Sequence, residues 1–362
     1  MFIKGGDVCL NSDVVKLNLK RKEIFTKWKE LLTSRNITNF SAAELKNIDV
    51  TIGIFNSNDE LIATGSCAGN VLKYVAVKSN EEQNGATFNK IVTELMDILS
   101  QRRIFHIFVF TKPMYSSSFQ YIGFNELASS KFGVILEKGD HVISDYIQSI
   151  PQKKQQSKKR VAAIVMNANP FTNGHLYLVE TAALENDLVY IFVVNNDVSL
   201  FSTNERVQLV KLGTKHLDNV IVVNGSDYMV SYATFPAYFL DTVDEIIQYQ
   251  TTLDARIFRD QIAPPLNIKK RYLGTEPYSR TTSIYNDVLQ KELPPIVEPV
   301  ILKRKLSKEG KIITATEVRM KIQAGKIKDI RDFVPVTTYD FIVNNINKLQ
   351  ERIRKGMKIS GN

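Results

Sequence analysis

One polar turn carries residues suited to binding phosphate, and it consists of Thr172, Asn173, Gly174 and His175. The turn follows the apolar, β-prone run 161–166 and precedes apolar positions at helical spacing, which predicts the order strand, turn, helix. In a parallel sheet such a turn lies at the carboxyl end of a strand, where the next helix directs free N–H groups and its positive dipole end outward. The turn therefore predicts an anion site. A histidine that merely caps the helix or packs in the core is the alternative.

Hydroxyl groups and an arginine recur in a second stretch, 313–319, which reads Ile-Thr-Ala-Thr-Glu-Val-Arg. Apolar Met320 and Ile322 follow, so this stretch also predicts a turn that opens a helix. Thr316 and Arg319 are suited to holding polyphosphate at such a helix start. The first turn contains one glycine and no lysine, so it is neither the dinucleotide pattern G-x-G-x-x-G nor a P-loop.

Apolar strand candidates alternate with helix candidates around these two turns. The expected strands are 161–166, 188–194, 220–224, 271–274 and 296–302, and the expected helices, besides the one after the first turn, are 205–216, 236–249, 281–291, 316–324 and 339–354. This alternation predicts a parallel, Rossmann-like sheet with helices on both faces. Each crossover should be right-handed.

The first half of the chain predicts a mixed α/β domain. The expected helices are 16–35, 88–99 and 117–121, and the expected strands are 50–55, 61–67, 72–77, 104–110 and 132–137. This order, and the stretch Phe-Gln-Tyr-Ile-Gly-Phe at 119–124, resemble the GNAT N-acetyltransferase fold. Where that family binds the pyrophosphate of acetyl-CoA, this chain has the acidic pair Glu81 and Glu82, which would repel phosphate. We therefore expect a degenerate acetyltransferase-type domain with a docking or scaffolding role.

Length and composition predict two domains joined by a linker. The chain has 362 residues, enough for two cores. The polar segment PQKKQQSKK at 151–159 has the composition of a solvated linker. We place the GNAT-like domain at 1–148, the linker at 149–159 and the second domain at 160–362. The two cysteines, Cys9 and Cys67, lack the spacing of a metal site or of a disulfide framework.

The formal net charge of +9 suggests an acidic partner. Nucleic acid, an acidic carrier protein and ATP all fit that charge, but no zinc-finger, RNP or helix-turn-helix pattern supports nucleic acid. No apolar run approaches the roughly 20 residues of a membrane span, and the first residues lack the apolar region of a signal peptide. We therefore expect a cytoplasmic protein that binds neither membranes nor nucleic acid.

Several stretches together resemble the citrate lyase ligase family, a member of the nucleotidyltransferase superfamily marked by Thr/His-x-Gly-His after its first strand. The stretches that carry the resemblance are 169–175, 199–201 with Arg206, 233–239, 274–278, 313–319 and 334–339. The family implies an acid–thiol ligase that converts ATP and acetate to acetyl adenylate and pyrophosphate. The acetyl group then passes to the thiol of a CoA-derived group on the acyl carrier subunit of citrate lyase, which activates the lyase.

The resemblance also implies roles for individual residues. The expected catalytic residues are His175, Thr172 and Arg319, with His175 donating a hydrogen bond to the α- and β-phosphates. The expected ATP-binding residues are Asn169, Phe171, Gly174, Gly274, Glu276, Tyr278, Arg304, Thr314 and Thr316. The acetate side is expected at Tyr228, Ser231, Thr234 and Phe235. Two alternatives stay open. Glu276 could cap the following helix, and Arg304 could be a basic residue at a strand end with no role in ATP binding. Mg²⁺ is expected with ATP, held mostly by phosphates and water, so no protein metal site is expected.

Two other functions remain open at this point. One is a different adenylyltransferase of the same superfamily, of the pantetheine-phosphate or nicotinamide-mononucleotide type. Such enzymes also use Thr/His-x-Gly-His, but commonly lack the acetyltransferase-like leader and the block Ala-Thr-Phe-Pro at 233–236. The other is a non-catalytic protein that senses acyl groups, against which the intact His175 and Arg319 argue.

Overall fold

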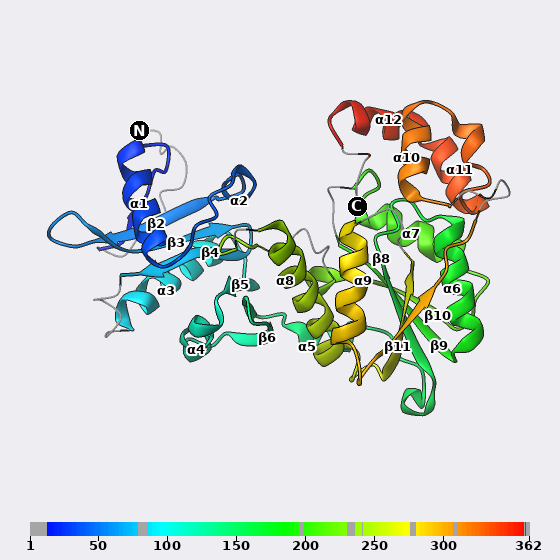
Figure 1. Cartoon of the computed structure of the whole chain (residues 1–362), viewed down its shortest axis with the longest axis horizontal. Coiled ribbons are helices and arrows are strands. Elements are labelled where there is room, and N and C mark those ends of the chain that lie inside the picture. The colour runs from blue at the N-terminus through cyan, green and yellow to red at the C-terminus, as the bar shows by residue number, and fades with distance from the viewer. Residues whose placement is uncertain are drawn as a thin grey trace. The chain divides into compact units, whose positions relative to one another are not determined.

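The computed structural model describes residues 13–78, 85–195, 199–229, 236–240, 242–275, 280–306, 310, 312–357 and 359 (Figure 1). The chain forms two compact units. The first contains Met1–Ser144 and Phe235–Leu253, and the second contains Asp145–Thr234 and Asp254–Asn362. The division falls inside two helices, α5 (Ile143–Ser149) and α8 (Val243–Arg256).

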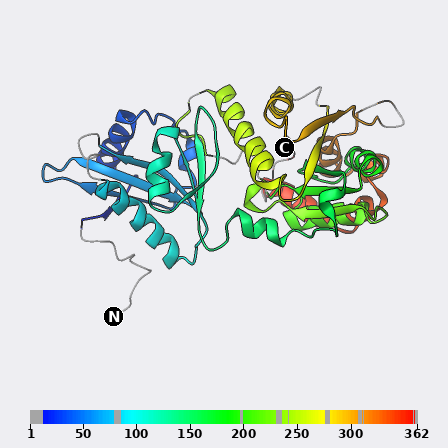
Figure 2. The ribbon, with the colours of Figure 1, turned by 90° about the horizontal axis from the view of Figure 1, so that it is seen from below.

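The first unit is built on a mixed sheet in the strand order β1-β2-β3-β4-β5-β7-β6. Its strands are β1 (Val15–Lys16), β2 (Val50–Phe55), β3 (Leu61–Ala68), β4 (Val71–Val77), β5 (Ile107–Thr111), β6 (Asn125–Ser129) and β7 (Val134–Lys138). Its helices include α1 (Lys22–Ser34), α2 (Ala42–Leu45), α3 (Ala86–Gln101) and α4 (Ser116–Tyr121), of which α1 and α3 pack against the strands (Figure 2).

The strands β4 and β5 are parallel and pair at only two positions, through Val71 and Leu72 of β4. Beyond this pairing a cavity of about 520 Å³ opens, lined among others by Val77, Phe88 and Tyr115. A non-glycine residue with a left-handed backbone, Tyr74 at φ 54°, lies in β4 just after the paired positions. Such a residue bends a strand, and here the bend accompanies the separation of β4 from β5.

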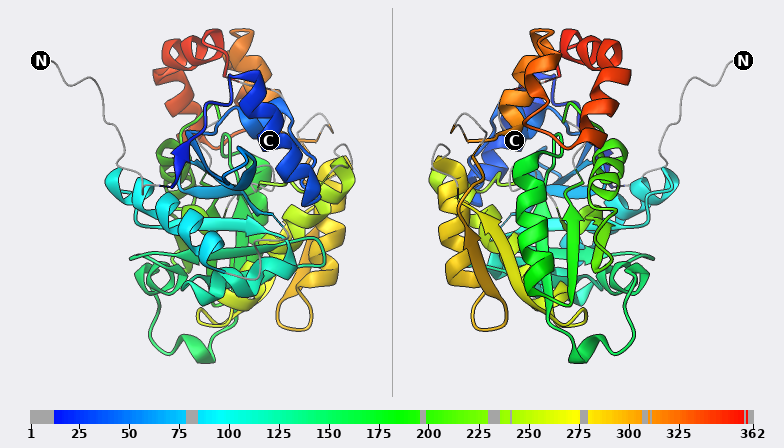
Figure 3. Two further views of the ribbon diagram at one scale, coloured as in Figure 1. Left: turned by 90° about the vertical axis from the view of Figure 1, so that its left-hand side faces the viewer. Right: turned by 90° about the vertical axis from the view of Figure 1, so that its right-hand side faces the viewer.

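The second unit is built on a parallel sheet in the order β10-β9-β8-β11-β12. Its strands are β8 (Val161–Met166), β9 (Leu188–Val193), β10 (Val220–Asn224), β11 (Ile268–Gly274) and β12 (Glu298–Leu302). Its helices are α6 (Asn173–Glu185), α7 (Thr203–Gly213), α9 (Arg280–Glu292), α10 (Ala315–Gln323), α11 (Val336–Asn344) and α12 (Ile346–Arg354) (Figure 3). The predicted parallel sheet is confirmed.

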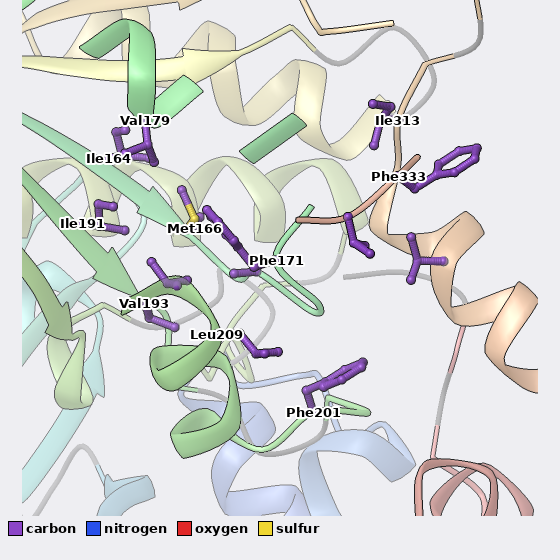
Figure 4. Close-up of a cluster of buried hydrophobic side chains, with 14 of the residues drawn as sticks. Ile164, Met166, Phe171, Val179, Ile191, Val193, Phe201, Leu209, Ile313 and Phe333 are labelled. Atoms are coloured by element: carbon purple, nitrogen blue, oxygen red, sulfur yellow. The ribbon is translucent and has the colours of Figure 1, made fainter. Parts of the chain in front are cut away.

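The core of the second unit lies between one face of this sheet and the helices α6 and α7, with α11 packed against α7 and α12 against α10 and α11. Alternate residues of β8 and β9 point into it, as expected for strands with period two. Phe171 and Ile313, from the two stretches predicted to bind phosphate, belong to the same cluster of buried side chains (Figure 4). The two stretches therefore share one core. Of the helices that the structure describes, none has the length and apolar character to span a bilayer.

Three predicted helices differ from the observed ones. The helix expected at 16–35 begins only at Lys22, and Val15–Lys16 forms the strand β1. The helix expected at 236–249 begins only at Val243, because Thr242 caps it by accepting a hydrogen bond from the Glu245 N–H (3.3 Å). The helix expected at 339–354 is divided into α11 and α12 at Asn345, whose side chain donates to the Phe341 carbonyl (2.9 Å). Local side-chain bonds to the backbone compete with helix continuation, and hydrophobic periodicity does not reveal them.

The division into units also differs from the predicted ranges. The segment 235–253, which we expected within the second domain, groups with the first unit. Tyr238 accounts for this, because its hydroxyl donates to the Phe110 carbonyl (2.5 Å) and its ring lies 4.5 Å from that of Tyr74. These partners are more than 100 positions away in the sequence.

The predicted linker is partly packed. Gln156 is buried, donates to the Leu266 carbonyl (2.6 Å) and accepts from the Tyr190 hydroxyl (3.0 Å). Polar composition indicated solvation, but this amide is satisfied by two distant partners and is therefore stable in the interior.

Candidate functional site

The turn between β8 and α6 holds His175 by a reciprocal capping arrangement. Thr172 is the N-cap of α6, and its hydroxyl accepts a hydrogen bond from the His175 N–H (3.3 Å). The Thr172 N–H in turn donates to Nδ1 of His175 (3.0 Å). His175 therefore does cap the helix, which was the alternative interpretation, and the residue as a whole is half-buried. The cap orients the imidazole through Nδ1 and does not use Nε2.

These contacts decide which nitrogen of His175 carries the proton. A backbone N–H can only donate, so Nδ1 must be the acceptor and Nε2 must carry the hydrogen. The Thr172 hydroxyl also lies 2.9 Å from Nδ1. Burial, and after it the positive charge of Arg304, lowers the pKa of His175 from 6.5 to about 4. At neutral pH the residue is thus a neutral imidazole that offers Nε2–H as a hydrogen-bond donor.

The ring of His175 stacks on Phe171, with the centroids 5.9 Å apart and the planes 12° apart. Phe171 is fully buried. Gly213, near the end of α7, provides its space, because a Cβ there would lie 2.6 Å from a ring carbon of Phe171. Gly213 was expected inside the helix 205–216, where a glycine gives no signal that a ring from another element needs its space.

The second predicted turn lies directly beside the first. Thr314 is the N-cap of α10 and accepts a hydrogen bond from the Glu317 N–H (3.1 Å). A Cβ on Gly174 would lie 3.5 Å from the Ile313 carbonyl oxygen, which is ordinary contact. Two helix starts predicted from stretches 140 positions apart therefore lie beside each other, and with them the positive dipole ends of the two helices.

Arg319 joins the two turns from the inside. It is fully buried and donates to the Asn169 carbonyl (2.6 Å), to the Thr316 hydroxyl (2.9 Å) and to the Ile359 carbonyl (2.8 Å). Burial lowers its pKa to about 10. We expected this guanidinium on the β- and γ-phosphates, whereas these three bonds direct it at the protein. In this structure it acts as a clamp that holds the first turn, the second turn and the C-terminal segment together.

Asn169 and Arg206 secure the other side of the first turn. The buried Asn169 accepts from the Phe201 N–H (3.2 Å) through Oδ1. Arg206 is fully buried and donates to the main-chain carbonyls of Asn167 (2.8 Å) and Val194 (2.7 Å), which follow β8 and β9. Arg206 was named only among the residues that carry the family resemblance, with no role of its own. A lone arginine in a helix gives no signal that it is buried.

Arg304 follows the strand β12 by two residues, and Gly274 is the last residue of the neighbouring strand β11. The Arg304 side chain donates from Nε to the Thr275 carbonyl (2.6 Å). Its effect on the pKa of His175 indicates that its charge acts on the first turn. Among the described residues other than its chain neighbours, no atom lies within 4 Å of the position where a Cβ of Gly274 would be.

The remaining predicted site residues are less fully described. Tyr228 is buried, and its ring lies 5.3 Å from that of Tyr146. The others, Glu276, Tyr278, Ser231, Thr234 and Phe235, lie outside the described residues. Across the described residues, no group of three or more histidine, cysteine, aspartate or glutamate side chains has the arrangement of a metal site.

Most of the chain is similar to proteins of one known family. Residues 161–342 match the family described as "Citrate lyase ligase C-terminal domain". A citrate (pro-3S)-lyase ligase from Escherichia coli (strain K12) is 33% identical over 333 residues, which are 89% of this chain and 94% of that protein. Among solved structures, a putative nicotinate-nucleotide adenylyltransferase from Vibrio parahaemolyticus is 17% identical with a TM-score of 0.32, over 56% of this chain and 99% of the other. A putative acyl-CoA N-acyltransferase from Klebsiella pneumoniae is 12% identical with a TM-score of 0.29, over 35% and 95%.

Proposed function

The chain belongs to the citrate lyase ligase family, and we propose that it activates citrate lyase by acetylating the prosthetic-group thiol of the acyl carrier subunit at the expense of ATP. The observation that carries this mechanism is the fixed neutral His175, which offers Nε2–H beside two converging helix starts. Such a site stabilises negative charge without supplying a nucleophile.

In the first step an acetate oxygen attacks the α-phosphorus of ATP. The bond from that phosphorus to the bridging oxygen breaks, and pyrophosphate leaves with the bonding electrons. The transition state carries charge on the phosphate oxygens, so positioning and hydrogen-bond donors matter more than covalent catalysis. His175 donates from Nε2 to these oxygens, and the N–H groups at the start of α6 add their dipole.

In the second step the carrier thiol attacks the carbonyl carbon of acetyl adenylate. The carbon–sulfur bond forms, the carbon–oxygen bond to AMP breaks, and the thiol proton is released. Acetate itself is a poor acyl electrophile, whereas its mixed anhydride with AMP has a good leaving group. The turn 172–175 contains no serine, cysteine or lysine, which agrees with direct transfer from adenylate to thiol.

The remaining assignments follow from the neighbourhood of His175. Arg304 supplies positive charge for the β- and γ-phosphates, and the hydroxyls of Thr314 and Thr316 lie at the start of α10, where those phosphates would meet its N–H groups. Arg319 positions both turns from the interior. Mg²⁺ accompanies ATP as part of the nucleotide substrate.

The test is to incubate the full chain with ATP, Mg²⁺, acetate and deacetylated citrate lyase. We expect AMP release in step with recovery of lyase activity, and acetate-dependent exchange of pyrophosphate into ATP when the lyase is omitted. Exchange that depends on nicotinamide mononucleotide or pantetheine phosphate in place of acetate would identify a different adenylyltransferase. Absence of adenylation under all these conditions would favour a binding protein.

A further inference from the structure

An open cavity of about 520 Å³ runs along the outer edge of β10 in the second unit. β10 is the edge strand of the parallel sheet, so one side of its main chain has no neighbouring strand among the described residues. The end of α5 and the residues that follow it form one wall, including Tyr146 and Ile150, and Lys211 of α7 lies on the other. We call this cavity the β10-edge groove.

The main chain of β10 offers hydrogen-bonding groups to the groove. Tyr146 donates from its hydroxyl to the Asn224 carbonyl (2.9 Å), whereas the Gly225 N–H donates to the Val193 carbonyl of β9 (2.8 Å). Main-chain groups of successive strand residues point alternately to the two sides, so Val222 presents its N–H and C=O on the same side as Asn224. An extended ligand with amide groups can therefore pair with Val222 as an added strand does.

The side chains of the groove change in character along its length. The exposed Lys211 provides a positive charge at one end of the groove. It lies about 12 Å along α7 from Thr203, the first residue of that helix. Ile150 and Val223 are apolar, and Asn195 with Ser226 makes the opposite end polar. A ligand that fits this sequence has an anionic group at one end, an apolar segment and amides in the middle, and a small polar group at the other end.

The polar end of the groove is connected to the site by hydrogen bonds. Thr203 donates to Oδ1 of Asn195 (3.3 Å) and accepts from Nη2 of Arg206 (2.9 Å). Arg206 also donates to the carbonyl of Asn167, the residue immediately after β8 (2.8 Å). The groove thus ends at the carboxyl edge of the sheet, where the turn with His175 also lies.

We propose that the β10-edge groove receives the pantetheine-type arm of the carrier's prosthetic group, an inference that rests on the proposed function. This arm contains a phosphate, an apolar segment, amides and a terminal thiol, in the order that the groove predicts. Lys211 pairs with the phosphate, the main chain of Val222 pairs with an amide, and the thiol leaves the groove near Asn195, toward the adenylate.

The test compares two reactions of the full chain, acetate-dependent pyrophosphate exchange without carrier and acetylation of the deacetylated lyase. The variants are Lys211→Glu, which reverses the charge, and Ser149→Tyr, which fills the groove. The matched controls are Lys215→Glu and Gln148→Tyr, which change exposed neighbours that do not line it. We expect a rise of about tenfold in the KM for the lyase with each groove variant, because Lys211→Glu removes the charge contact and Ser149→Tyr occupies the space of the arm. Exchange should stay within about twofold of the wild type.

Free CoA provides a second measurement, because it carries the same arm without the carrier. It should inhibit lyase acetylation more weakly with Lys211→Glu than with Lys215→Glu. The proposal is overturned if groove and control variants behave alike, or if the groove variants lose exchange and acetylation equally. If the wild type exchanges pyrophosphate but never acetylates the lyase, the proposed function itself fails, and this outcome is distinct because it appears before any variant is made.

Discussion

The proposed role of His175 predicts a large loss of adenylation when the imidazole is removed. Its Nε2–H is fixed by one main-chain bond of 3.0 Å at Nδ1 and by a stacked Phe171, so the donor is preorganised. Removing one preorganised donor from a comparable site costs about 10² to 10³ in rate, or about 3 to 4 kcal/mol. We therefore expect His175→Ala to lower acetate-dependent pyrophosphate exchange by a factor of that order.

A matched variant separates the donor from the cap. Thr172→Val removes the hydroxyl that caps α6 but keeps the main-chain N–H that holds Nδ1. It should lower the free energy of unfolding by about 1 kcal/mol, because the cap is lost. Its loss of exchange activity should be much smaller than that of His175→Ala. The assay is isotope exchange between pyrophosphate and ATP at saturating acetate, with urea unfolding as the measure of stability. Near-normal exchange by His175→Ala, with normal folding, would refute the mechanism.

Four further predictions follow from the structure. Gly213→Ala should lower the free energy of unfolding by about 1 to 3 kcal/mol in urea, because the new methyl overlaps Phe171. Gly174→Ala should fold normally, since its methyl makes ordinary contacts, but should raise the KM for ATP if phosphates approach this backbone. Arg319→Lys should cost about 2 kcal/mol in the same unfolding assay through lost buried hydrogen bonds, and a wild-type value would exclude the clamp. The fourth prediction concerns pH. Because the pKa of His175 is lowered from 6.5 to about 4, between these pH values the unfolded state binds a proton that the folded state does not. The free energy of unfolding should therefore fall as the pH drops from 6.5 toward 4, and His175→Ala should lose this dependence in urea titrations.

The degenerate character of the first unit stays a prediction. The cavity between β4 and β5 has the volume of a small-molecule site, whereas the sequence places Glu81 and Glu82 where the related fold binds pyrophosphate. We expect no micromolar binding of acetyl-CoA to the full chain by calorimetry. Micromolar affinity would contradict the scaffolding role.

Most of the order of strands and helices, though not the strand β6, followed from the sequence, as did the turn with His175, because these features depend on neighbouring residues. An apolar run, a polar turn and helical spacing lie within 25 residues, and local sterics and hydrogen bonding are enough to predict strand, turn and helix. Thr172 three positions before His175 is likewise a local pattern. The parallel sheet followed in turn, because strands that alternate with helices have few other ways to bury both faces.

Only the tertiary structure decided which charged groups are buried and what they hold. Arg319 bonds Asn169, which is 150 positions away, and Arg206 bonds Asn167, which is 39 away. Gly213 matters because a ring from another element occupies its space. Residue spacing in the sequence does not predict such pairs. A buried arginine is stable only where carbonyl groups from distant parts of the chain accept its hydrogen bonds, and only the tertiary structure shows where that occurs.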